Sequence, residues 1–211
     1  MVKDKLKEVK NIEYFTKGHR GILYIGDYKK KKVVIKTERK DSEAIGRIEN
    51  EVNYLKILND KGIGPKLYFY DKKKFTYFAY EYIDGLFFPI WLEHATKKNK
   101  ALIKKIIKNV FTQCFRMDKI KTNKEEMHHP YKHVIISKGK KPVLVDFERC
   151  HKTLEPKNVT QFSTYMISEF MVNLLKDKGI KVDREKIIKA AKVYKKKMCK
   201  KNLDKIVNLI K

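Results

Sequence analysis

The sequence predicts an α+β fold with two lobes, a strand-rich N-terminal lobe over residues 1–84 and a helical C-terminal lobe over residues 85–211. Two observations predict it. Short runs of β-branched and aromatic residues with one helical pattern fill the first part of the chain. Longer patterns of helical period dominate the second part. The 211 residues, 42% of them hydrophobic, are enough for one large domain or two small lobes with a real core.

In the first lobe we expect one helix among strands. The helix covers residues 42–58, with Ser42 as its N-cap and a stripe through Ala44, Ile48, Leu55 and Leu58. Gly85 follows the last apolar run and suits a hinge between the lobes. Four strands are expected, over residues 21–25, 33–36, 66–70 and 75–80.

In the second lobe the apolar residues recur with helical spacing. One small hairpin interrupts them, formed by residues 134–136 and 143–145 around a lysine-rich turn. The expected helices cover residues 99–117, 158–176, 184–199 and 202–210.

The charge is extreme, with 51 Lys+Arg against 25 Asp+Glu and a net charge of +26. Such a surface attracts phosphate-rich partners, RNA or the ribosome above all, but it also suits a solvated, lysine-rich surface. No apolar stretch is long enough for a membrane span, and the N-terminus lacks the apolar middle region of a signal peptide. We therefore expect a cytoplasmic protein without a membrane partner.

Three charged residues occupy positions that are costly without partners. Lys36 ends the apolar run that begins at Val33, so its stem should be half-buried. Glu51 lies on the apolar stripe of the predicted helix, where an unpaired carboxylate is expensive. Asp146 ends the apolar run 143–145, a position that suits a metal ligand.

The order of four segments resembles the protein kinases. Val33-Val-Ile-Lys36 resembles the V-A-I-K strand, and Glu51 resembles the helix-C glutamate that pairs with its lysine. Glu81-Tyr-Ile-Asp-Gly85 resembles the hinge, and Asp146-Phe147-Glu148 resembles the D-F-G segment with Glu148 in place of glycine. Over about residues 15–175, the chain looks most like small archaeal proteins classed as predicted Ser/Thr protein kinases, distant relatives of RIO-type kinases.

The resemblance implies a protein-kinase-like fold, with an antiparallel-sheet N-lobe that carries one helix and a reduced helical C-lobe. It implies ATP and Mg²⁺ as cofactors, with Lys36 on the phosphates, Glu51 orienting Lys36 and Asp146 holding Mg²⁺. Gly18-His-Arg-Gly21 would be a reduced phosphate-covering loop, with two glycines where the family has three. The backbone from Glu81 to Ile83 would receive the adenine.

The catalytic loop departs from the family pattern H-R-D-L-x-x-x-N. If His133 takes the Asn position and becomes a metal ligand, Glu126 becomes the candidate catalytic base. Glu126 lies seven residues before His133, two more than the pattern has. The alternative anchor, His128-His-Pro, puts Pro130 at the base position and leaves no base.

The function expected from this reading is transfer of the γ-phosphoryl group of Mg·ATP to a Ser or Thr hydroxyl of an unidentified protein substrate. Lys36, Asp146 and Glu126 would be the catalytic residues. Two alternatives stay open: a non-catalytic ATP-binding module, and an RNA- or ribosome-associated protein that uses the fold as a scaffold.

Overall fold

The computed structural model describes residues 5–18, 21–38 and 46–211. The chain divides into two compact units. Unit 1 contains the residues up to Ile83 together with Asp146–Arg149, and unit 2 contains Asp84–Val145 and Cys150–Lys211. The predicted mixture of helices with an antiparallel sheet is confirmed.

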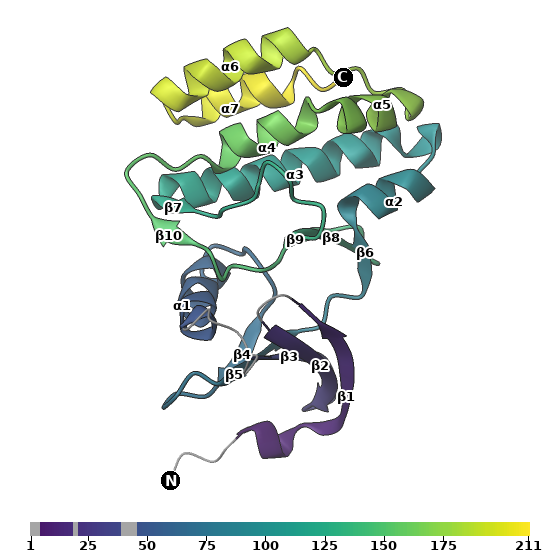
Figure 1. Cartoon of the computed structure of the whole chain (residues 1–211). Helices are drawn as coiled ribbons and strands as arrows, with labels where there is room; N and C mark the ends of the chain where they lie inside the picture. Colours follow the sequence, from purple (N-terminus) through teal and green to yellow (C-terminus); the bar gives the residue numbers. More distant parts are fainter. Residues whose placement is uncertain (1–4, 19–20, 39–45) are drawn as a thin grey trace. The chain divides into compact units, whose positions relative to one another are not determined.

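Unit 1 is built on an antiparallel sheet with the strand order β1-β2-β3-β5-β4 (Figure 1). The four predicted strands correspond to β2 to β5, whereas β1 was not predicted. Every residue of β1 is exposed, so its sequence lacks the apolar alternation of a half-buried strand. The strands are β1 (Lys10–Lys17), β2 (Gly21–Tyr28), β3 (Lys31–Glu38), β4 (Leu67–Tyr70) and β5 (Tyr77–Glu81).

The central strand β3 is buried on both of its faces. Val33 and Ile35 pack with Ala79 in the hydrophobic core on one side of the sheet. Because side chains alternate along a strand, Val34 and Lys36 point to the opposite side. Lys36 therefore belongs to the face on which α1 (Arg47–Asn59) packs against β3, β4 and β5.

Helix α1 presents an apolar stripe with one acid in it. Its buried residues are Ile48, Glu51, Val52, Leu55 and Leu58, which recur at helical spacing. The helix begins five residues later than predicted, at Arg47 after Gly46. The predicted cap Ser42 and the stripe position Ala44 lie outside the described residues.

The described part of unit 2 contains helices together with a small three-stranded sheet and a two-stranded pair. The predicted hairpin is present as β8 and β9, and β6 extends it. The strands are β6 (Gly85–Phe87), β7 (Thr122–Asn123), β8 (Val134–Ser137), β9 (Pro142–Leu144) and β10 (His151–Lys152). The helices are α2 (Phe88–His94), α3 (Lys100–Lys119), α4 (Asn158–Met166), α5 (Glu169–Asp177), α6 (Arg184–Lys196) and α7 (Lys200–Val207).

Two expectations for unit 2 are corrected. The helix predicted over residues 158–176 is divided into α4 and α5, because Ser168 caps α5 by accepting a hydrogen bond from the Met171 N–H. Gly85 lies in β6, paired with Ser137, rather than in a free hinge. A Cβ on Gly85 would lie 2.1 Å from the Ile136 carbonyl oxygen, so close strand packing requires glycine here.

A buried carboxylate joins three helices of unit 2. Asp118 of α3 accepts hydrogen bonds from the Asn158 amide at the start of α4 and from the Tyr194 hydroxyl of α6. Burial raises the pKa of Asp118, although these hydrogen bonds oppose the shift. Asp118 therefore fixes the packing of α3, α4 and α6.

Within the described residues, no helix combines the length and the apolar character that crossing a membrane requires.

Candidate functional site

The candidate site of unit 1 is centred on the ammonium group of Lys36. Its Nζ lies 2.7 Å from Glu51 Oε2, 3.2 Å from Asp146 Oδ1 and 3.0 Å from Glu148 Oε2. The Lys36 side chain is only 12% exposed. The structure thus brings together the three residues that the sequence singled out, and it adds Glu148.

Glu51 joins Lys36 to the segment that carries the other two acids. Its Oε2 accepts from Lys36, while its Oε1 accepts from the Phe147 N–H at 3.0 Å. Both carboxylate oxygens therefore have a donor, which offsets part of the cost of burying a carboxylate in a residue only 3% exposed.

A second contact from α1 holds the same segment. The Asn50 side-chain amide donates to the Glu148 carbonyl oxygen at 2.9 Å. The Phe147 ring packs against Gly64, where a Cβ would lie 2.8 Å from the ring. Two neighbouring residues of α1 and one glycine thereby fix the backbone that carries Asp146 and Glu148.

Asp146 adopts a left-handed backbone conformation, with φ of 64°. This region is unfavourable for most side chains, although aspartate tolerates it better than bulkier residues do. Its side chain is also the most exposed of the acids around Lys36, at 38%. Asp146 is thus the acid most accessible to a ligand.

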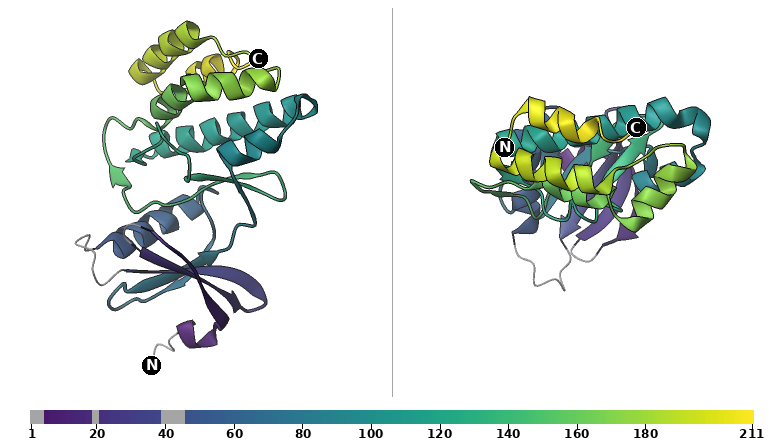
Figure 2. Two further views of the ribbon diagram at one scale, coloured as in Figure 1. Left: turned by 45° about the vertical axis from the view of Figure 1, so that its right-hand side comes forward. Right: turned by 90° about the horizontal axis from the view of Figure 1, so that it is seen from above.

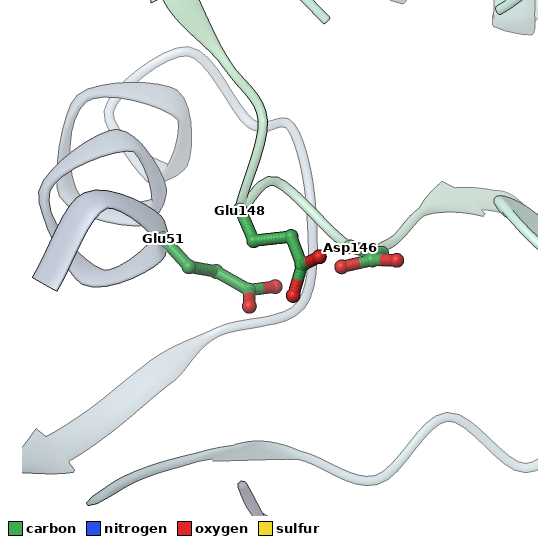
Figure 3. A group of neighbouring side chains, drawn as sticks. All are labelled: Glu51, Asp146 and Glu148. Atoms are coloured by element: carbon green, nitrogen blue, oxygen red, sulfur yellow. The ribbon is translucent and has the colours of Figure 1, made fainter. Parts of the chain in front are cut away.

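The three carboxylates converge from two segments, as Figure 3 shows. Glu51 extends from α1, and Asp146 and Glu148 extend from the loop after β9 toward it. Burial alone would lower the pKa of Lys36, but Glu51, Asp146 and Glu148 outweigh that effect and raise it well above its usual value. Burial raises the pKa of Glu51, with Lys36 acting in the opposite direction.

The donor set of this cluster fits a hard divalent cation. One oxygen from each of Glu51, Asp146 and Glu148 lies within 4.8 Å of the others. Carboxylate oxygens are the protein ligands that Mg²⁺ prefers. Glu51 is the most buried of the three acids, so the more exposed Asp146 and Glu148 are the better-placed ligands.

The predicted phosphate-covering loop is only partly described. The Gly18 N–H donates to the Gly21 carbonyl oxygen at 2.9 Å, whereas His19 and Arg20 lie outside the described residues. A Cβ on Gly21 would lie 3.2 Å from Lys36 Cε and 3.0 Å from the Thr37 carbonyl oxygen. The absence of a side chain at Gly21 therefore leaves room for the stem of Lys36.

The predicted adenine-binding backbone is largely used by the sheet. The Glu81 N–H donates to the Lys66 carbonyl oxygen at 2.9 Å, and the Tyr82 N–H donates to the Lys32 carbonyl oxygen at 3.2 Å. Among the described residues no such donation is recorded for the Ile83 N–H. Of the three positions, Ile83 is the one whose amide can serve a ligand.

The predicted catalytic loop lies in unit 2, where Glu126 and His133 are neighbours. Glu126 Oε2 lies 3.5 Å from His133 Nε2, and Lys124 Nζ lies 3.3 Å from His133 Nδ1. A hydrogen bond from the Lys124 ammonium group to Nδ1 requires the tautomer with the ring proton on Nε2, the nitrogen that faces Glu126. Because both ring nitrogens have protein neighbours, the arrangement suits His133 better as an orienting group for Glu126 than as a metal ligand.

Sequence reasoning noted Glu148 only as a departure from the D-F-G pattern, and it missed Lys124. Glu148 follows a buried Phe147 within a strand-like run, a signal that could have placed it beside Asp146. Lys124, only 2% exposed, lies in a polar loop without periodicity, so nothing in the sequence separates it from the surface lysines.

Comparison of the sequence with known proteins does not assign the chain to a family. No protein-family model matches the chain, and a search of curated proteins found no significant match. Functional inference therefore depends on the geometry of the site.

Proposed function

We propose that the chain binds Mg·ATP in unit 1 and transfers its γ-phosphoryl group to a Ser or Thr hydroxyl, as an atypical protein kinase. One observation carries the proposal. A buried lysine is held by three carboxylates from two distant segments, and this arrangement supplies a fixed cation beside oxygen ligands for a metal. A triphosphate with its magnesium needs both.

Each residue has a distinct role in the proposed reaction. Lys36 binds phosphate oxygens as a point charge, and Glu51 orients its ammonium group. Asp146 and Glu148 hold Mg²⁺, which supplies charge neutralisation along the phosphates when it is bound. Ile83 offers its backbone to the adenine.

The chemical step exchanges one phosphorus–oxygen bond for another. The bond between the γ-phosphorus and the oxygen bridging to ADP breaks, and a bond to the substrate hydroxyl oxygen forms. Glu126 accepts the hydroxyl proton, and His133 with Lys124 holds the carboxylate in position. Catalysis consists mainly of positioning and charge stabilisation.

The contacts of His133 favour a second candidate, a non-catalytic ATP-binding module. Its ring nitrogens face Lys124 and Glu126, so the loop lacks the amide oxygen that binds a second metal in active kinases. This candidate keeps nucleotide binding by Lys36 and Asp146 but has no turnover.

Phosphoryl transfer from γ-labelled ATP tests the proposal. We expect the full chain with Mg²⁺ to label itself or Ser/Thr peptides, and Asp146→Asn and Glu126→Gln to reduce the rate by at least about a hundredfold. Asp60→Asn, at an exposed acid after α1, should keep the wild-type rate. Equal background rates for the wild type and Asp146→Asn would contradict the enzyme, and nucleotide binding without transfer would favour the second candidate.

A further inference from the structure

Helices α6 and α7 carry a dense excess of positive charge. Eight lysines lie between Glu185 and Asp204, and no acidic residue separates them. The two helices pack against each other, and α6 and α7 form the outermost helical layer of unit 2 (Figure 1 and Figure 2).

The apolar faces of these helices are used by the core, and the lysines face outward. In α6 the buried residues are Ile187 and Tyr194, and in α7 they are Asn202, Leu203 and Ile206. Asp183 pairs with Lys186, and Asp204 pairs with Lys200. The remaining six exposed lysines form what we call the α6–α7 lysine surface: Lys189, Lys192, Lys195, Lys196, Lys197 and Lys201.

Folding gains little from this arrangement. Lys189, Lys192 and Lys196 succeed one another at spacings of three and four residues, where like charges destabilise a helix by about 0.2–0.5 kcal/mol a pair. Within residues 5–18, 21–38 and 46–211, no ion pair is recorded for the six lysines. Lys195 and Lys196 benefit from the negative end of the α6 dipole, but Lys189 and Lys192 lie too far from it.

We propose that the α6–α7 lysine surface binds the phosphate backbone of a nucleic-acid duplex. Lysines three residues apart advance by about 4.5 Å along a helix, and a duplex presents a phosphate charge about every 1.7 Å of its axis. A row of such ammonium groups can therefore neutralise several phosphates along a duplex. Lysine is also a point charge, suited to phosphate contacts without base reading.

Other polyanionic partners fit this surface less well. A helix that lies on a membrane surface needs an exposed apolar face with large side chains. In α6, which is described in full, the large exposed apolar residues are limited to Ile188 and Val193. Single-stranded nucleic acid is bound by aromatic stacking, and Tyr194, the aromatic residue of these helices, is buried. The surface therefore matches the regular charge of a duplex.

This interface is independent of the nucleotide site proposed above, because it uses no residue of the Lys36 cluster. Binding to an RNA duplex and a DNA duplex of the same sequence, measured by fluorescence anisotropy over a series of KCl concentrations, tests it. We expect the wild-type chain to bind with a steep salt dependence. Comparison of the two affinities shows whether the surface prefers an RNA duplex or a DNA duplex.

The decisive comparison uses matched triple variants. Lys189→Gln with Lys192→Gln and Lys196→Gln should weaken binding by about ten- to a hundredfold and reduce the log–log salt slope by about three. Lys72→Gln with Lys73→Gln and Lys74→Gln removes the same charge from the turn between β4 and β5, and should leave both quantities nearly unchanged. Circular dichroism checks that each variant is folded. If the first triple variant unfolds, a second one that combines Lys195→Gln, Lys197→Gln and Lys201→Gln replaces it in the same binding measurement.

Several outcomes would overturn the proposal. These are no duplex binding by the wild type, equal losses in the α6 variant and the turn variant, and binding that is indifferent to salt. Affinity for polyglutamate or for phosphatidylserine vesicles equal to that for the duplexes would likewise rule out recognition of the phosphate backbone.

Discussion

At the scale of single residues, the balance of charge around Lys36 governs both stability and binding. One ammonium group faces three carboxylates, so the cluster carries excess negative charge in the absence of a ligand. Such a site holds its lysine firmly, and it favours a nucleotide that arrives with a divalent cation.

Removal of the ammonium group should destabilise the protein in a pH-dependent manner. Lys36→Met keeps the stem but leaves buried acids unpaired, so we expect about 3–5 kcal/mol less free energy of unfolding near neutral pH. Burial already raises the pKa of Glu51, and loss of the cation raises it further. When the pKa of an acid is higher in the folded than in the unfolded state, the fold loses stability as the pH rises from the unfolded-state pKa through the folded-state pKa.

The deficit of Lys36→Met should therefore shrink as the pH falls toward about 4, where protonation removes the unpaired charge. Urea unfolding of the variant and the wild type at neutral and acidic pH measures this difference in the free energy of unfolding. A deficit of the same size at both pH values would show that the carboxylates do not depend on Lys36.

Glu148 should make nucleotide binding depend on metal. Glu148→Gln removes one negative charge beside Lys36, so affinity for ATP without divalent cations should rise by about tenfold. Affinity for Mg·ATP should not rise, because a metal ligand is also lost. Titration calorimetry with and without Mg²⁺ gives the ratio of the two affinities, for Mg·ATP and for metal-free ATP. Glu49→Gln, which changes an exposed acid on α1, is the matched control. An unchanged ratio in Glu148→Gln would argue against this role.

The residues that could be predicted from the sequence share one property. Lys36 and Glu51 interrupt clear apolar periodicities, so their burial and their need for a partner follow from the pattern. Asp118 lies four residues after Cys114 on the stripe of α3 and could have been found in the same way. Lys124 could not, because its burial arises from loop packing between distant segments.

At the scale of elements, α1 acts as the support of the candidate site. Asn50 and Glu51 hold the Phe147–Glu148 backbone, and Gly64 leaves room for the Phe147 ring. The position of Asp146 thus depends on packing that is remote from it in sequence.

Gly64→Ala tests this support. Gly64 has φ of 80°, and an added Cβ would lie 2.8 Å from Phe147 and 3.2 Å from Leu55. We expect a cost of about 1–2 kcal/mol from the backbone and a further 1–3 kcal/mol or so from overpacking, together with weaker Mg·ATP binding. Gly46→Ala is the control, because φ is 76° there but no atom lies within 4 Å of the added Cβ. Equal losses of stability and affinity in both variants would show that Phe147 does not couple packing to the site.

The elements that escaped prediction have physical explanations. The residues of β1 are all exposed, so the strand exists through pairing with β2 rather than through its own apolar pattern. The break between α4 and α5 depends on a single serine cap within a continuous apolar stripe. In the sequence Gly85 suits a hinge, but in the structure it lies in β6, where Ile136 approaches it closely.

At the scale of the whole molecule, the charged groups are divided between the two units. Unit 1 contains the Lys36 cluster, and unit 2 contains the Glu126–His133 pair and the α6–α7 lysine surface. The segment Asp146–Arg149 belongs to unit 1 although the chain on both sides of it belongs to unit 2. The sequence predicts a boundary near residue 84, and unit 2 begins at Asp84, but the return of Asp146–Arg149 to unit 1 does not follow from chain order.

The binding of Mg·ATP to the cluster is the central claim, and titration calorimetry on the full chain tests it most directly. Asp146→Asn is the informative variant because asparagine also tolerates the left-handed backbone of this position, so the fold should persist. We predict one Mg·ATP bound per chain in the wild type, an affinity at least about tenfold lower in Asp146→Asn, and no change in Asp60→Asn. No binding by the wild type, or equal affinity in Asp146→Asn, would contradict the account.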